Sequence, residues 1–304
     1  MNSFTLRSSE RWVLHGDVSP DVLNKFAYLG RKLSWEHTDI SQKEFIDFIE
    51  LIPTNSDIKH IPLIIKELSN LKKIIIPTWF VPELHHEALP KSVNTIIIGL
   101  LNEISKKKVG WDANEVFYNI NELQGVGENV DFLGSNFPNL NRLHVRIGKK
   151  ESEYMEIQKL SKLSDLIVEK PITISALNNL SNLSIQYLQL SKGKFESFDG
   201  LFNIQSLLKL ELHFCNVCNL SGLKILSSVS DIEMWNCKKI IDIKPLADIK
   251  SVKRIYIMGC SVNMDDNNLC DYFKSRGFTK IRYEPNRSDT LFEAIRGDAA
   301  NLLI

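Results

Sequence analysis

Three short motifs in the chain place reactive residue types at spacings that certain enzymes use. A histidine pair, His85 and His86, begins HHEALP in the way that a zinc-protease helix begins, but the fourth residue after His86 is Pro90 instead of the second histidine ligand. Gly125 and Gly127 have the spacing of two glycines of a phosphate-binding loop, without a third glycine or a following Lys-Ser/Thr. We therefore expect a polar return segment at the histidines and an ordinary loop at the glycines.

The cysteines are the third candidate for chemistry. Cys215 and Cys218 form a C-x-x-C pair, which is the spacing of a redox dithiol or of half a zinc site, but no second pair or histidine cluster accompanies them. Cys215, Cys237 and Cys260 instead recur at one position of a repeated segment, so we expect a buried ladder of small side chains. We predict that the five thiols are unpaired and reduced, and that the protein holds no metal and no cofactor.

The repeated segment has the pattern L-x-x-L-x-L-x-x-C, which is the strand half of a leucine-rich repeat. The pattern is clearest in the copies that begin at Leu207, Val229 and Val252. At steps of roughly 22 to 26 residues, further copies begin at Leu71, Val93, Phe117, Leu140, Leu163, Ile185 and Phe278. The copy at Phe117 has Glu122 where an apolar residue belongs, and the copy at Phe278 is the least regular. One repeat cannot bury its apolar face alone, so the copies must stack into a solenoid.

The segments that return between strands also repeat. In IIDIKPLADIKSVKRIYI, apolar residues recur at steps of three from Ile240 to Val252, which suits a tight 3₁₀ turn or short helix that starts near Pro245. This phrase resembles the internalin-like class of bacterial leucine-rich repeat proteins, whose repeats have about 22 residues. Over residues 71–285 the resemblance implies an α/β fold, a curved leucine-rich repeat solenoid with a single parallel sheet on its concave face. The resemblance brings no catalytic residue with it.

The ends of the chain do not follow the repeat. Before residue 71, apolar spacing predicts helices over residues 22–29, 45–52 and 61–71, and we interpret residues 1–70 as a helical N-terminal cap or as degenerate repeats. Residues 286–304 are expected to cap the last strand. No linker rich in proline, glycine or serine divides the chain, so we do not predict independent domains.

Composition sets limits on partners and location. Lys plus Arg equals Asp plus Glu at 37 each, so no global field attracts nucleic acid or an anionic membrane, although local patches remain open. No apolar run approaches the roughly 18 residues that a bilayer span needs. The first residues, MNSFTLRSSERWVLHGD, lack the apolar core of a secretory signal, whereas surface internalins carry an export signal. We therefore expect a cytoplasmic protein.

The remaining candidate for function is the outward face of the strands. Side chains alternate along a strand, so Leu210 and Leu212 in the core direct Lys209, Glu211 and His213 outward. The same register predicts a partner-binding set of Tyr187, Gln189, Lys209, Glu211, His213, Asp231, Glu233, Trp235, Arg254 and Tyr256. Further outward rows are Arg142, His144 and Arg146, then Asp165, Ile167 and Glu169, and finally Lys280, Arg282 and Glu284.

Two interpretations of this face remain open. Aromatic residues among charges are typical of the centre of a protein interface, and Trp235 beside Tyr256 would supply that centre. An acidic middle with arginine and lysine rows on either side would then suit a partner that is basic at its centre. Alternatively, neighbouring charges such as Lys209 and Asp231 simply pair across strands, and Trp235 only packs against Tyr256.

Three classes of function follow. The first is a non-enzymatic cytoplasmic module, monomeric on its own, that binds one protein partner; an immunity protein or inhibitor that neutralises a toxin would fit. The second is an enzyme, which the first 70 residues are too short and too poor in motifs to support. The third is a secreted effector or host-binding protein delivered without a cleaved signal.

Overall fold

A computed structural model represents the protein. It describes residues 65–66, 68–99, 110–127, 130–146, 152–171, 173–201, 204–262, 268–284 and 290–297 in full, and the backbone of 2–7, 12–18, 48–51 and 151. The chain forms two compact units, residues 1–143 (unit 1) and 144–304 (unit 2). The predicted helix over residues 22–29 lies outside the described residues.

Unit 1 begins with antiparallel strands and continues with parallel ones. Strands β1 (Asn2–Arg7), β2 (Trp12–Val18) and β3 (Phe48–Leu51) pair antiparallel in sequence order. Strands β4 (Lys73–Ile76), β5 (Thr95–Ile98) and β6 (Glu122–Val126) then add in parallel, with β4 paired to β3. In the described part of unit 1, the returns include the 3₁₀ helices η3 (Thr78–Glu83) and η4 (His86–Ala88) and the short α-helix α3 (Leu133–Asn136).

The structure corrects the predicted helices before the first clean repeat. Phe48–Leu51 form β3 and not the second half of a helix over residues 45–52, because the backbone of this segment pairs with β2 on one side and β4 on the other. Between Ile65 and Leu71, the described residues make successive tight turns, in which the amide of Leu68 bonds the carbonyl of Ile65 and the amide of Leu71 bonds that of Leu68. Two-sided backbone pairing has overridden a helical spacing of apolar residues.

The irregular copy near Phe117 begins three residues later than the sequence spacing predicted. Leu123 pairs with Ile96 in the sheet, so the copy begins at Ile120 and Glu122 takes an outward position. The expectation of a loop at Gly125 was also wrong, since Gly125 lies inside β6 with a φ of +77°. A Cβ at Gly125 would overlap the carbonyl oxygen of Ile98, and this close approach of two backbones explains why glycine stands there.

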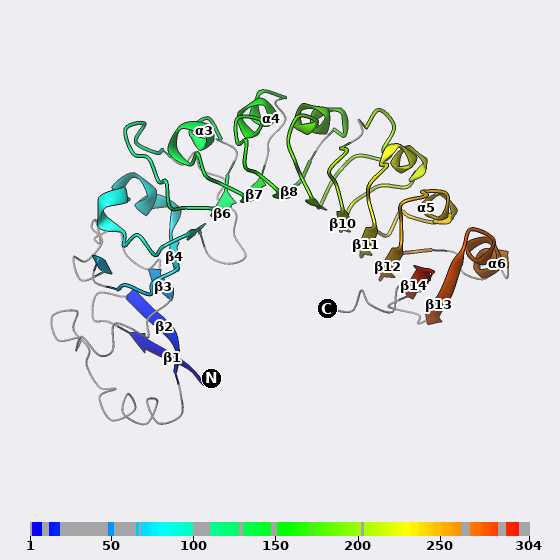
Figure 1. The fold of residues 1–304 in the computed structure, drawn as a ribbon, viewed down its shortest axis with the longest axis horizontal. Helices are drawn as coiled ribbons and strands as arrows, with labels where there is room; N and C mark the ends of the chain where they lie inside the picture. Colours follow the sequence, from blue (N-terminus) through cyan, green and yellow to red (C-terminus); the bar gives the residue numbers. More distant parts are fainter. Residues whose placement is uncertain are drawn as a thin grey trace. The chain divides into compact units, whose positions relative to one another are not determined.

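Unit 2 contains the regular repeats. Parallel strands follow one another in sequence order, and Figure 1 shows them along one side of the unit with the helical returns along the other. The strands are β7 (Arg142–Arg146), whose first two residues belong to unit 1, β8 (Asp165–Glu169), β9 (Tyr187–Ser191), β10 (Lys209–His213), β11 (Asp231–Trp235) and β12 (Arg254–Met258). The returns include α4 (Glu151–Ile157), η5 (Ser175–Leu180), η6 (Ser221–Ile225), α5 (Lys244–Ala247) and α6 (Asn268–Ser275). Pro245 stands in the first turn of α5, as its lack of an amide donor favours.

The repeat pattern accounts for the core of unit 2. Leu207, Leu210 and Leu212 are at most 1% exposed, and the equivalent residues of neighbouring copies lie beside them in register. Each of the strands β8 to β12 is followed by a residue with positive φ, namely Lys170, Lys192, Phe214, Asn236 and Gly259. The amides of Lys170, Lys192, Phe214 and Asn236 bond the last carbonyl of the following strand, so the turn that leaves one repeat is tied to the next repeat. The stacked repeats form the predicted leucine-rich repeat solenoid.

The cysteine ladder is confirmed. Cys215, Cys237 and Cys260 are buried and free, and the thiols of Cys215 and Cys237 donate to the carbonyls of Leu190 and Leu212 in the preceding repeats. The hydrogen bond with Cys237 and burial raise the pKa of the Cys215 thiol. Cys218, by contrast, is exposed and bonds the carbonyl of Glu196, so the C-x-x-C spacing places one thiol in the core and the other at the surface.

The last strand in the sequence reverses direction. Strand β14 (Leu291–Arg296) inserts antiparallel between β12 and β13 (Phe278–Glu284), so the copy at Phe278 runs in the direction of β12 but does not pair with it as a tenth parallel strand. Phe292 and Ala294 on β14 are fully buried opposite Ile257 and Ile255, whereas most of β13 is exposed. Because β14 offers alternating buried residues and β13 does not, β14 occupies the inner position and the charged strand forms the edge.

Candidate functional site

The candidate site is the outward face of β9 to β12, which we call the strand face. All ten residues of the predicted partner-binding set lie on it, in parallel register: Tyr187, Lys209, Asp231 and Arg254 form one row, and Gln189, Glu211, Glu233 and Tyr256 the next. His213 and Trp235 form a third row with Ser191 and Met258. The inward residues between these positions are buried, so the alternation inferred from the sequence is confirmed. Whether the ten residues bind a partner stays a prediction.

One continuous polar network joins these rows. The Tyr187 hydroxyl donates to Gln189 Oε1 at 2.9 Å, and Gln189 Nε2 lies 3.3 Å from His213 Nδ1. His213 Nε2 is 3.0 Å from Glu211 Oε2. Glu211 continues the chain of contacts through its other oxygen, which accepts from the ammonium of Lys209 at 2.8 Å. Each side chain therefore constrains the next, across two strands.

The network continues onto β11, β12 and β14. Lys209 Nζ also lies 2.9 Å from Glu233 Oε1, which accepts from Arg254 Nη1 at 3.2 Å. Arg254 makes two further ion pairs, with Asp231 at 3.8 Å and with Glu293 of β14 at 3.3 Å. The charged residues of the strand face thus do pair across strands, as one of the two interpretations expected, although Lys209 pairs with Glu211 and Glu233 and not with Asp231.

The centre of the strand face carries an excess of negative charge. Two cations, Lys209 and Arg254, stand among four carboxylates, those of Glu211, Asp231, Glu233 and Glu293. Burial alone would raise the pKa of Glu211, but hydrogen bonds from His213 and Lys209 lower it to about 2. Burial lowers the pKa of Lys209, and Glu211 and Glu233 more than offset that effect and raise it. Glu211 and Lys209 therefore keep their charges at neutral pH, and the face offers a fixed acidic centre.

An aromatic cluster borders the network. The rings of Trp235 and Tyr256 lie 5.3 Å apart at an interplanar angle of 43°, and His213 lies 6.1 Å from Trp235. Trp235 Nε1 donates to Glu233 Oε2 at 3.4 Å, while the guanidinium of Arg254 lies over the Tyr256 ring at 5.5 Å. The adjacency of Trp235 and Tyr256 is confirmed, and both rings remain partly exposed. The cluster is anchored to the network through Glu233 and Arg254.

The sequence-based list omitted Phe214. This residue follows β10 with a φ of +55°, and its side chain is 56% exposed. Its amide donates to the carbonyl of Trp235, so its backbone lies beside the end of β11. A left-handed backbone conformation is unfavourable for a residue that carries a Cβ. Exposure of the phenyl ring to water also contributes no stability to the folded chain. Comparison of the turn positions would have revealed it, because the other repeats have Lys170, Lys192, Asn236 and Gly259 there.

The flanking basic rows need correction. Strand β14 lies between β12 and β13, with Glu293 between Tyr256 and Arg282, so Lys280 and Arg282 are not the next rows beside β12. Arg282 is also paired with Glu284 on its own strand. On the other flank, Arg146 belongs to unit 2, whereas Arg142 belongs to unit 1 and pairs with Glu122 at 3.5 Å. The acidic centre is therefore not enclosed by two adjoining basic rows.

The histidine pair has a structural partner. His85 Nδ1 lies 2.9 Å from one oxygen of Glu115, and His86 Nδ1 lies 2.6 Å from the other oxygen, which also accepts from the His86 amide. Burial alone would raise the pKa of Glu115, but these hydrogen bonds lower it to about 2. Within the described residues, no three His, Cys, Asp or Glu side chains are placed to hold a metal ion. The pair therefore clamps a return segment of unit 1 to the residues before Phe117.

The stacked strands, helical returns and cysteine ladder define a protein of the leucine-rich repeat class, built from short repeats. No protein-family model and no curated protein sequence matches the chain. None of the helices in the described part of the chain is long and apolar enough to cross a membrane.

Solved structures with a similar fold include two internalins of Listeria monocytogenes. Internalin C2 is 18% identical, with 72% of this chain and 84% of that chain covered and a TM-score of 0.37. Internalin InlF is 15% identical, with coverage of 77% and 72% and a TM-score of 0.40. The plant peptide hormone receptor RGFR1, solved in complex with RGF2, is 12% identical, with coverage of 68% and 38% and a TM-score of 0.34. These likenesses concern the repeat fold alone.

Proposed function

We propose that the protein is a non-enzymatic binding module whose strand face in unit 2 holds one protein partner. The observation that carries the proposal is the network from Tyr187 to Arg254, which fixes the side chains of the face before any partner arrives. A surface whose rotamers are already fixed loses little conformational entropy on binding. The partly exposed Trp235 and Tyr256 beside it supply the aromatic centre in which interface energy concentrates.

The charge of the face points to the chemistry of the partner. Four carboxylates against two cations favour a partner that presents lysine or arginine side chains at its centre. Partly exposed rings next to carboxylates also suit a guanidinium group, which stacks on aromatic faces. Within this class we propose an immunity protein or inhibitor that acts in the cytoplasm and neutralises a basic toxin, such as one that cleaves nucleic acid. The unpaired cysteines agree with a reducing compartment.

The experiment compares two matched tryptophan variants. Trp235→Ala should weaken binding of the captured partner by roughly 2 kcal/mol or more, with little change in melting temperature, because Trp235 is partly exposed on the face. Trp79→Ala is the control, since Trp79 is 39% exposed and lies on η3 of unit 1. The immobilised protein captures partners from its native lysate, and the affinity of the purified partner is then measured for each variant.

A charge variant tests the acidic centre. Among the described residues Asp231 makes one ion pair, at 3.8 Å, so Asp231→Asn should leave the fold intact and slow association in a salt-dependent manner. Glu233→Lys would be a poorer probe, because it places a third cation beside Lys209 and Arg254. The captured protein is also expressed alone and together with this chain, and growth inhibition that is relieved by co-expression supports the toxin assignment. Equal affinity of the Trp235→Ala, Trp79→Ala and parent proteins would refute the strand face as the binding site.

A further inference from the structure

A second candidate site lies in unit 2, away from the strand face. A cavity of about 350 Å³ is lined by Ala247, Asp248, Lys250, Arg276 and Arg296. These residues come from the end of α5, the turn after α6 and the end of β14. The amide of Arg296 donates to the carbonyl of Lys253, just before β12. The cavity therefore opens beside the N-terminal ends of the parallel strands.

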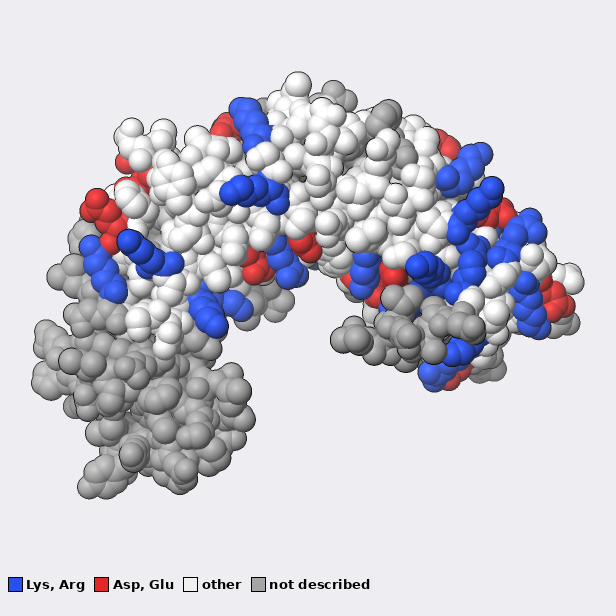
Figure 2. Space-filling view, viewed as in Figure 1, with Lys and Arg blue, Asp and Glu red and all other residues white. Residues whose placement is uncertain are grey.

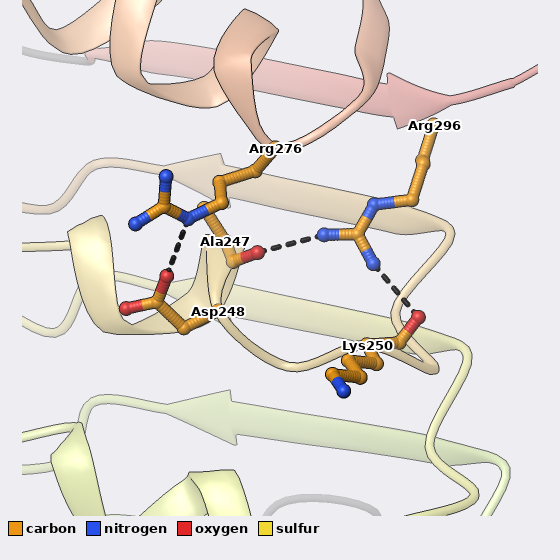
Figure 3. A pocket seen from close by; sticks show the side chains of 5 residues that line it. All are labelled: Ala247, Asp248, Lys250, Arg276 and Arg296. Carbon is orange, nitrogen blue, oxygen red and sulfur yellow. Dashed lines mark hydrogen bonds and ion pairs between the residues drawn. The ribbon is translucent and has the colours of Figure 1, made fainter.

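Two guanidinium groups reach this cavity from opposite sides (Figure 3). Arg296 donates to the carbonyls of Ala247 at 2.7 Å and Lys250 at 2.8 Å, which holds its guanidinium rigidly against the loop after α5. Arg276 Nε donates to Asp248 Oδ1 at 2.8 Å, and its guanidinium lies 4.6 Å from the centre of the Tyr272 ring. Among the described residues, the terminal nitrogens of Arg276 contact two hydroxyl groups, those of Ser275 at 3.4 Å and Tyr272 at 3.3 Å. The Nε contact with Asp248 thus holds the guanidinium of Arg276, while its terminal nitrogens make only these long hydrogen bonds within the described part of the chain.

The charges around the cavity do not balance. Lys250, Arg276 and Arg296 stand against one carboxylate, Asp248, which is already occupied by Arg276 and by the Tyr272 hydroxyl. The side chains of Lys250 and of Lys253, whose carbonyl accepts from the Arg296 amide, make no ion pair or hydrogen bond in the described part of the chain. Figure 2 shows lysine and arginine gathered over this end of unit 2, in a protein whose total charge is zero. The lining residues therefore carry a net charge of two positive units, which favours the binding of an anion.

We infer that this cavity binds a phosphate group carried by a small soluble molecule. Planar guanidinium groups donate in pairs to phosphate oxygens, and a dianion matches the excess of two positive charges on the lining residues. Capping of carbonyls at and after the end of α5 occupies Arg296, whereas the contacts of Arg276 with Asp248 and Tyr272 position its guanidinium at the cavity. Asp248 acts as a positioning residue that holds Arg276 through Nε and leaves its terminal nitrogens for the ligand.

The test uses inorganic phosphate and pyrophosphate as probes, with isothermal titration calorimetry on the full chain at low, constant ionic strength. Each charge-assisted contact that is lost should weaken binding at least about tenfold. We therefore expect Arg276→Gln and Lys250→Met each to reduce the affinity for pyrophosphate by at least about tenfold. Both side chains are exposed, so these variants should fold; Arg296 is left unchanged because its contacts support the loop after α5.

The matched control is Lys238→Met, which removes the same charge from an exposed lysine. Lys238 follows β11, at the C-terminal ends of the strands and so away from the cavity. The inference predicts parent-like pyrophosphate binding in this control. No binding to the parent protein, or an equal loss in Lys238→Met and Lys250→Met, would overturn it. A single-stranded RNA that binds the parent and is not displaced by pyrophosphate would assign the lysines to a polymer-binding surface and would also overturn it.

Discussion

The assignment of inward and outward residues is tested most directly at β10, by the same substitution at two leucines. Leu210 is 1% exposed and lies in register between Leu188 and Ile232. Loss of a buried leucine side chain costs about 2–5 kcal/mol. An aspartate there would be protonated, and holding a group of pKa about 3.9 protonated at pH 7 costs roughly 4 kcal/mol more.

The sum for Leu210→Asp, about 6 kcal/mol or more, reaches the whole stability of an ordinary domain, which is about 5–15 kcal/mol. We therefore expect unit 2 of this variant to be largely unfolded at 25 °C. Leu208 is the control, because it lies only two residues away and is 48% exposed. Leu208→Asp should change the free energy of unfolding by no more than about 0.5 kcal/mol.

The assay is urea unfolding of the parent and both variants at pH 7, followed by circular dichroism. A cooperative transition for Leu210→Asp with a midpoint close to that of the parent would refute the buried position of Leu210. Equal destabilisation by the two variants would refute the repeat frame, in which Leu210 is a core position of β10 and Leu208 is an exposed position before the strand. The backbone of Leu208 is bonded to Gln186 in either case, so the comparison isolates the side chains.

Three further predictions address the thiols, the histidine clamp and the glycine in β6. The buried thiol of Cys215 should react slowly with a thiol reagent in the native protein and the exposed Cys218 thiol quickly, and stoichiometric zinc lost with either residue would contradict the ladder. The pKa of Glu115 falls from 4.5 to about 2 on folding, so its contribution to stability is complete above pH 4.5 and is lost as the pH falls toward 2. Glu115→Gln should therefore flatten the curve of unfolding free energy against pH between these two values. Gly125→Ala should destabilise by more than the roughly 1–2 kcal/mol of left-handed strain, whereas Gly200→Ala, at a φ of +80° in open space, should cost only that strain in the same urea assay.

Much of the fold could be predicted from the spacing of apolar residues. Alternation along a strand has period two and the repeat has a length of about 22 residues, so Leu207, Leu210 and Leu212 had to face inward and Lys209, Glu211 and His213 outward. The same spacing predicted the cysteine ladder and Pro245 in the first turn of a return helix. These features depend only on contacts between neighbouring repeats, so they could be predicted from one sequence.

The ends of the repeat array were decided by tertiary pairing. Apolar spacing over residues 45–52 suits a helix, but Phe48–Leu51 pair with strands on both sides. At the other end, β14 displaces β13 from the position beside β12, because Phe292 and Ala294 complete the core and β13 offers no such alternation. Competition between segments far apart in the chain determined both outcomes, and a periodic pattern contains no information about such competition.

The candidate site divides in the same way. The sequence alone determined which ten side chains share the strand face, because register follows from the repeat. Only the tertiary structure decided that Lys209 bridges Glu211 and Glu233 and that Arg254 bridges Glu233 and Glu293, since long side chains choose among several partners within reach. The basic cavity of Ala247, Lys250, Arg276 and Arg296 also depends on the folded chain, because β14 returns to the loop after α5 from nearly 50 residues away. The alternation along a strand determines whether a side chain faces the core or the solvent. Its hydrogen-bond and ion-pair partners depend on which distant segments of the chain the folded core places beside it.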